Sequence, residues 1–236
     1  MNYSKSKGGS QKFIIKIFLL ILIGLLNNNF SQAQAIDSVS NLNTSNTIYV
    51  FTNRNIDTLP EALSFKNGVN DSLGLTILKV TLNDSGKIVN QLINYEDFTT
   101  QTSKIESDWL LFVHGDNKTY NQSVKRGFNI QKTHNINVIV FSWSSRDPEL
   151  NGLKNLNQSK RNILKSMDHF IELLGIMESF KTTNPAFKRN ANLSLLLHSL
   201  GNLYLENFIR TSTHSKNFDT IFENVIINSA AADQKK

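Results

Sequence analysis

The sequence predicts an α/β fold, a three-layer sandwich built around a mostly parallel β-sheet. Three short apolar runs each end in polar or glycine residues and lead into helix-like sequence: 109–113, 137–141 and 193–197. Apolar strands that alternate with helices are typical of a parallel sheet whose two faces are both covered. The chain has 236 residues, of which 39% are hydrophobic, so it can bury one sizeable core.

The remaining elements follow from periodicity and turn residues. The fold is expected to begin near Thr47, and two strands joined by a turn containing Asp84-Ser85-Gly86 are expected at an edge of the sheet. Apolar residues recur at three- and four-residue steps over 154–180 and predict one long helix there. Pro185 is expected to end this helix, because proline is disfavoured in helix interiors. The other expected strands are 73–82, 88–93 and 224–228, and the other expected helices are 120–133 and 201–211.

The first 35 residues resemble a targeting signal. Four lysines, the last of them Lys16, precede or interrupt an apolar stretch over 13–26, and Ala33-Gln34-Ala35 supplies a cleavage signature. An uncleaved membrane anchor is the alternative, but an apolar run of about ten residues is shorter than the roughly 20 that a spanning helix needs. We therefore expect a signal peptide at 1–35, a Ser/Asn-rich linker at 36–46 and a periplasmic or secreted domain at 47–236 with no stable membrane span.

The charge balance excludes several function classes. The chain carries 25 Lys and Arg against 19 Asp and Glu, but only 21 of these basic residues lie beyond the targeting segment. No basic stripe with interleaved aromatics remains, so a nucleic-acid partner is not expected. The absence of cysteine excludes disulfides and thiol catalysis. No metal-ligand spacing, phosphate-binding loop or dinucleotide motif occurs, so we expect no metal and no cofactor.

The run 193–202 carries the main chemical signal. An apolar strand stops at Ser199, and Leu200-Gly201 open the following helix. This is the pattern of a nucleophile elbow, in which a sharp strand-to-helix turn exposes a serine hydroxyl. The usual pattern is G-x-S-x-G, and Leu197 stands in place of the first glycine, so an ordinary strand end with a loop serine is the alternative. We expect Leu197 to press on the helix and Leu197→Ala to be tolerated.

The elbow is one of four ordered motifs that together resemble the α/β-hydrolase superfamily. The motifs are His114-Gly115, Phe141-Ser142-Trp143, 198–202 with the sequence H-S-L-G-N, and 228–233 with the sequence N-S-A-A-A-D. They are similar to a bacterial branch whose elbow is typically A-H-S-M-G-N and which often opens with a strand like 48–54. The resemblance spans 47–233. It implies a serine hydrolase acting on an ester or other acyl bond of a small-molecule or polymer substrate.

The resemblance also implies roles for individual residues. Ser199 would be the nucleophile, and the backbone N–H groups of Leu200 and of Asp116 or Asn117 would form the oxyanion hole. Asp233, just after the last strand, would be the acid, with a solvated loop aspartate as the alternative. The residues expected to support the loops are His114, Gly115 and Gly201.

The catalytic base is not found in the sequence. In this superfamily the histidine follows the acid, whereas the last histidine here, His214, belongs at the opposite end of the sheet. His134 and His169 are expected on helix flanks, and His198 is expected to point into the sheet. Two hypotheses follow: a hydrolase whose sequence is truncated at the C-terminus, so that the fold is incomplete, or a non-catalytic exported binding module.

Overall fold

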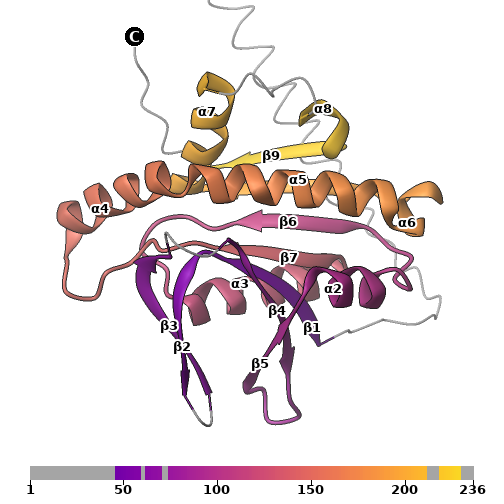
Figure 1. Ribbon diagram of the computed structural model, residues 1–236, viewed down its shortest axis with the longest axis horizontal. Helices are drawn as coiled ribbons and strands as arrows, with labels where there is room; N and C mark the ends of the chain where they lie inside the picture. The colour runs from indigo at the N-terminus through magenta and orange to yellow at the C-terminus, as the bar shows by residue number, and fades with distance from the viewer. Residues whose placement is uncertain (1–45, 60–61, 71–73, 212–217, 230–236) are drawn as a thin grey trace, which may run out of the picture. The chain divides into compact units, whose positions relative to one another are not determined.

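The computed structural model of the protein describes residues 46–59, 62–70, 74–211 and 218–229 (Figure 1). Seven strands form one sheet in the order β5-β4-β1-β7-β6-β8-β9. Strand β4 pairs antiparallel with β1 and β5, and the other four pairings are parallel. The strands are β1 (Thr47–Thr52), β4 (Thr76–Leu82), β5 (Ile88–Ile93), β6 (Trp109–Val113), β7 (Asn137–Ser142), β8 (Leu193–His198) and β9 (Asn224–Asn228). The predicted α/β fold with a mostly parallel sheet is confirmed.

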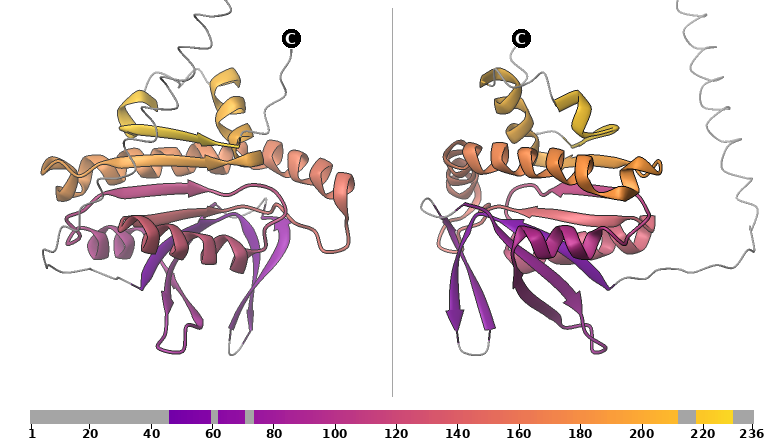
Figure 2. Two further views of the ribbon diagram at one scale, coloured as in Figure 1. Left: turned by 180° about the vertical axis from the view of Figure 1, so that it is seen from behind. Right: turned by 45° about the vertical axis from the view of Figure 1, so that its right-hand side comes forward.

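Helices cover both faces of the sheet (Figures 1 and 2). On one face, α3 (Tyr120–His134) buries Val124 and Phe128 against alternate residues of β1, β4, β6 and β7. On the other face lie α2 (Tyr95–Thr102), α4 (Gly152–Lys165), α5 (Met167–Thr183), α7 (Asn202–Thr211) and α8 (Phe218–Ile221). Two apolar cores therefore sit on opposite sides of the sheet, as the three-layer prediction requires.

Several elements of the structure were not expected from the sequence. Strands β2 (Arg54–Leu59) and β3 (Ala62–Val69) form a separate two-stranded sheet that extends away from the main one (Figure 2). Helix α2 begins with a capping box between Asn94 and Asp97. A short helix, α6 (Pro185–Lys188), begins at the proline that was expected only to end the preceding helix. Proline is well suited to the first turn of a helix, because that N–H has no intrahelical partner.

The predicted helix over 154–180 is two helices, so the prediction of one continuous helix is wrong. The break lies at Ser166, between α4 and α5. The Ser166 hydroxyl donates to the carbonyl of Asn162 and also shares a 2.7 Å hydrogen bond with the Tyr204 hydroxyl. Because a serine side chain competes for backbone carbonyls, it favours a break that periodicity alone does not reveal.

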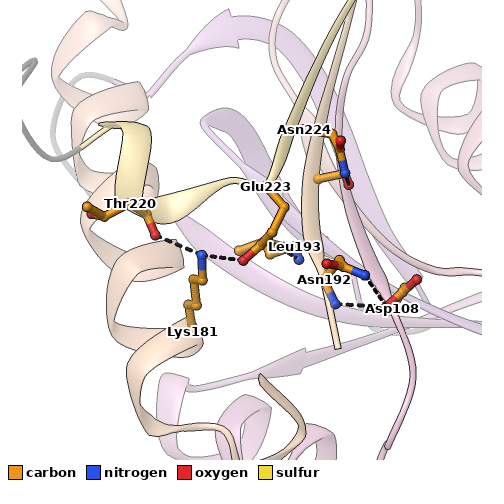
Figure 3. A network of polar contacts seen from close by, with 8 residues as sticks. Asp108, Lys181, Asn192, Leu193, Thr220, Glu223 and Asn224 are labelled. Carbon is orange, nitrogen blue, oxygen red and sulfur yellow. Dashed lines mark hydrogen bonds and ion pairs between the residues drawn. The ribbon is translucent and has the colours of Figure 1, made fainter. Parts of the chain in front are cut away.

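A polar network ties the amino-terminal ends of the last strands together (Figure 3). Lys181 on α5 forms a 2.5 Å ion pair with Glu223, whose second carboxylate oxygen accepts from the N–H of Leu193 at the start of β8. Asp108, just before β6, accepts from the N–H of Asn192. These contacts fix β6, β8 and β9 in register at the end of the sheet away from the serine motif.

The described part of the chain begins at Asn46, one residue before β1. The carbonyl of Asn46 already accepts a 2.9 Å hydrogen bond from the N–H of Leu82, directly before β1 starts at Thr47. The expected signal peptide at 1–35 and nearly all of the linker at 36–46 lie outside the described residues. Within the described ranges, no helix is both long and apolar enough to cross a bilayer.

Candidate active site

Ser199 sits at a strand-to-helix turn with strained backbone geometry. It follows β8 directly, begins the short 3₁₀ helix η1 (Ser199–Gly201) and precedes α7. Its φ is +51°, a left-handed conformation that costs a non-glycine residue about 1–2 kcal/mol. A residue held in this region marks a turn that the surrounding structure enforces. Nucleophile elbows have a sharp strand-to-helix turn of this kind.

Two glycines allow the loops to meet at this turn. A Cβ on Gly115 would lie 2.8 Å from Ser199 Cβ and 2.8 Å from His198 Nδ1. A Cβ on Gly201 would lie 2.7 Å from the carbonyl oxygen of His114. Contacts this short do not occur in folded proteins, so both positions require glycine. The structure therefore brings together the His-Gly loop after β6 and the serine turn after β8.

Leu197 lies at the end of β8, two residues before Ser199. Its side chain is fully buried in the core that also contains Leu200 and Tyr204. Side chains alternate along β8, so that of Leu197 enters the core beneath α7. That Leu197 presses on this helix stays a prediction. The structure gives no reason to expect that Leu197→Ala is tolerated.

Two backbone N–H groups near Ser199 have no partner among the described residues. Leu200 lies in the first turn of η1, where N–H groups lack intrahelical acceptors. On the His-Gly loop, the N–H of Asn117 donates to the carbonyl of Ser145 at 3.0 Å, whereas that of Asp116 makes no described hydrogen bond. Of the two loop candidates, Asp116 is thus the one with a donor to spare. Its carboxylate accepts from Asn155 on α4 at 3.2 Å, which fixes the loop.

The chain matches the family model "Alpha/beta hydrolase of unknown function (DUF900)" over residues 93–235, more than half of its length. The protein belongs to this α/β-hydrolase family. No curated protein and no solved structure matches the chain significantly. The resemblance found in the sequence is confirmed at the level of the superfamily.

His114 of this α/β hydrolase is a buried, neutral ring held on both sides. Its Nε2 accepts from the N–H of Trp143 at 3.2 Å, so Nδ1 carries the proton and donates to the Gly115 carbonyl at 2.8 Å. The ring also stacks on the Trp143 indole. Burial, followed by the charge of Arg54, lowers the pKa of His114 to about 3. Both ring nitrogens of His114 are therefore engaged in contacts that stabilise the loop, and neither is free to accept a proton from a nucleophile.

Arg54 is a feature of the α/β hydrolase that sequence reasoning missed. Its guanidinium is almost fully buried, and its Nε and Nη2 donate to Ser142 Oγ at 3.2 Å and to the Lys118 carbonyl at 2.9 Å. Its Nη1 has no partner among the described residues. Burial lowers the pKa of Arg54 to about 10, so it stays charged at neutral pH. No local pattern reveals it, because an arginine at a strand start is usually solvated.

The described histidines do not supply a base to Ser199. No described hydrogen bond joins its hydroxyl to a ring nitrogen; His134 ends α3 on the surface, and His169 lies on α5. His198 lines an open cavity beside α3, rather than being enclosed in the sheet as expected. His214 and Asp233 lie outside the described residues.

The part of the α/β hydrolase that the structure describes holds no group of three His, Cys, Asp or Glu side chains placed to bind a metal ion. Near Ser199 lie the neutral ring of His114 and the N–H groups of Leu200 and Asp116, which make no described hydrogen bond. The site can therefore present a hydroxyl and backbone donors to a polarised carbonyl group.

Proposed function

We propose that this α/β hydrolase is a serine hydrolase that cleaves an ester or another acyl bond with Ser199 as its nucleophile. The observation that carries the proposal is the left-handed φ of Ser199 at the junction of β8 and η1. The superfamily exposes its nucleophile by this geometry. The spare N–H groups of Leu200 and Asp116 support the same proposal, because they are donors with no other described role.

The chemistry would follow the usual two steps of acyl transfer. Ser199 Oγ attacks the acyl carbon while its proton passes to a base, and the alcohol or amine leaves with a proton. Water then cleaves the acyl-enzyme and restores the hydroxyl. The N–H groups of Leu200 and Asp116 would bind the oxyanion in each step, and one such donor is typically worth about 100- to 1000-fold in rate.

A second function is favoured by one observation. No described imidazole reaches the Ser199 hydroxyl, and the His114 ring is engaged elsewhere. An unactivated serine is a poor nucleophile. The alternative is therefore a non-catalytic binding module that keeps the fold of the family without its activity.

Labelling with a fluorophosphonate probe separates the two functions, because the probe reacts with activated serines. We expect the natural protein to be labelled and Ser199→Ala to lose all labelling. Ser229→Ala is the matched control, since Ser229 also follows a parallel strand, is exposed and has a φ of +47°. Unlabelled natural protein, or labelling that survives Ser199→Ala, would favour the binding module.

We further propose that the protein is exported, with residues 1–35 removed as a signal peptide. The lysine-rich start, the short apolar stretch and Ala33-Gln34-Ala35 support this. Mass spectrometry of the protein from its natural source should find Ile36 at the N-terminus. An intact Met1 terminus would refute cleavage.

A further inference from the structure

A cavity of about 450 Å³ adjoins Ser199 on the α3 face of the sheet. Phe112 and His198 line it from β6 and β8, and Gly115 lines it from the His-Gly loop. A Cβ added to Gly115 would lie 2.8 Å from Ser199 Cβ. The cavity therefore borders the two residues, Gly115 and His198, that lie next to Ser199. Its volume falls within the range of about 300–1000 Å³ that is usual for small-molecule sites.

The wall opposite the sheet is cationic. Gln122, Lys125, Arg126 and Asn129 come from one face of α3, at three- and four-residue steps, and Lys118 precedes the helix. None of the residues lining the cavity is an aspartate or a glutamate. The ion pairs among the described residues use Lys66, Lys181, Arg189 and Arg210, so the three cations of the cavity are not in any of them.

The positive charges of these residues affect His198, which lines the cavity on the side of the sheet. Burial is the main cause that lowers the pKa of His198, and the positive charges of Arg126 and Lys118 lower it further. The cavity thus has a positive potential, and Phe112, which is 3% exposed, closes it toward the sheet. A cleft lined by charges of one sign concentrates ligands of the opposite sign.

We propose that the cavity binds the anionic end of the substrate, a carboxylate or phosphate group on an acyl chain whose carbonyl carbon lies at Ser199. This inference rests on the proposed serine hydrolase function. The guanidinium of Arg126 suits a planar oxyanion, and the two lysines add point charges. The preferred substrates are then acidic esters rather than neutral ones.

Binding can be tested without catalysis. Calorimetry with the full chain carrying Ser199→Ala should detect glutarate or inorganic phosphate at low ionic strength, and the tighter of the two identifies the head group. Neutral glutaramide should bind far more weakly. The double variant Lys125→Gln/Arg126→Gln should weaken anion binding at least about tenfold, since a hydrogen bond to a charged group is worth about 1.5–3 kcal/mol. Lys132→Gln, on the same helix but outside the cavity lining, is the control and should bind as the parent does.

The His198 ring provides a local readout. An anion between Lys118 and Arg126 offsets their charges, so the pKa of His198 measured by NMR should rise when the anion is added and should not rise with glutaramide. The proposal is overturned if neither anion binds, if glutaramide binds equally well, or if Lys125→Gln/Arg126→Gln and Lys132→Gln behave alike. Binding of a short oligonucleotide with no binding of either small anion would also overturn it.

These outcomes are separate from those of the proposed function. Fluorophosphonate labelling without anion binding removes only the acidic-substrate inference. Anion binding without labelling leaves an anion-binding module and removes the hydrolase. If both hold, the natural protein should cleave the 4-nitrophenyl monoester of glutarate with a higher kcat/KM than 4-nitrophenyl butyrate, and Lys125→Gln/Arg126→Gln should reduce that preference.

Discussion

The two faces of the sheet differ most at the carboxyl end of β8. Leu197 points into a closed apolar core beneath α7 and is fully buried. Its neighbour His198 points to the other face, into an open cavity with Lys118 and Arg126 on its wall. Adjacent residues of one strand thus lie in different environments, because side chains alternate between the two faces of the sheet. One face is a closed core next to the serine turn, and the other face carries the cavity.

Removing the Leu197 side chain should have the largest effect on this comparison. Leu197→Ala leaves a cavity in a packed core and should lower the free energy of unfolding by about 2–5 kcal/mol. Leu196→Ala is the matched control, because Leu196 lies on the α3 face and is only partly buried. Urea unfolding of both variants should show the larger loss for Leu197. Equal losses would mean that the two faces are packed alike at this position.

Acid should act mainly through His114. Its pKa falls to about 3 in the folded protein, so the unfolded chain binds a proton first as the pH drops below about 6.5. The free energy of unfolding should therefore fall with pH between about 6.5 and 3, by at most about 1.4 kcal/mol per pH unit for this group.

Urea unfolding at a series of pH values measures this slope. His134→Gln, which removes an exposed histidine, is the control. His114→Gln should flatten it, at the cost of a lower stability at pH 7. A natural protein with constant stability from pH 6.5 to 4.5 would contradict the buried neutral ring.

The smallest expected effect concerns the turn between the two faces. Ser199→Gly should raise the free energy of unfolding by about 1 kcal/mol, because glycine adopts a φ of +51° without strain. Ser199→Ala keeps the strain and should not stabilise the protein. Thermal unfolding of the two variants makes the comparison, and a stabilising Ser199→Ala would show that the backbone at this position is relaxed.

Most of the sheet could be predicted because its strands are apolar on both faces. Strand β5 and the β6, β7, β8 and β9 runs lie within a residue of their expected bounds, and β4 is shorter than expected. The β2–β3 pair escaped prediction because its polar sequence lacks a clear alternation. Helix α2 was missed because its threonines have low helix propensity, although Asn94 and Asp97 gave a capping signal.

The candidate site was predictable only where a local motif marks it. The serine turn and the His-Gly loop lie together as expected, since the carboxyl ends of neighbouring parallel strands share one edge of the sheet. Arg54 and the cationic wall could not be found in this way. The positions of these residues depend on burial and on how β2, α3 and the loop before α3 lie together in the folded protein. The spacing of residues in the sequence does not reveal either.

The strand order also has a consequence for folding kinetics. Strand β1 joins the sheet through β7, where Thr52 bonds to Ser142 across 90 residues, and β6 meets β8 over a separation of 84 residues. Such distant pairings raise the contact order, and their loop-closure entropy slows folding. Other parts of the sheet come from consecutive sequence: β6, α3 and β7 make one parallel unit, β8, α7 and β9 make another, and β4 and β5 pair as a hairpin. We expect these local units to form first and the pairings of β1 with β7 and of β6 with β8 to form later.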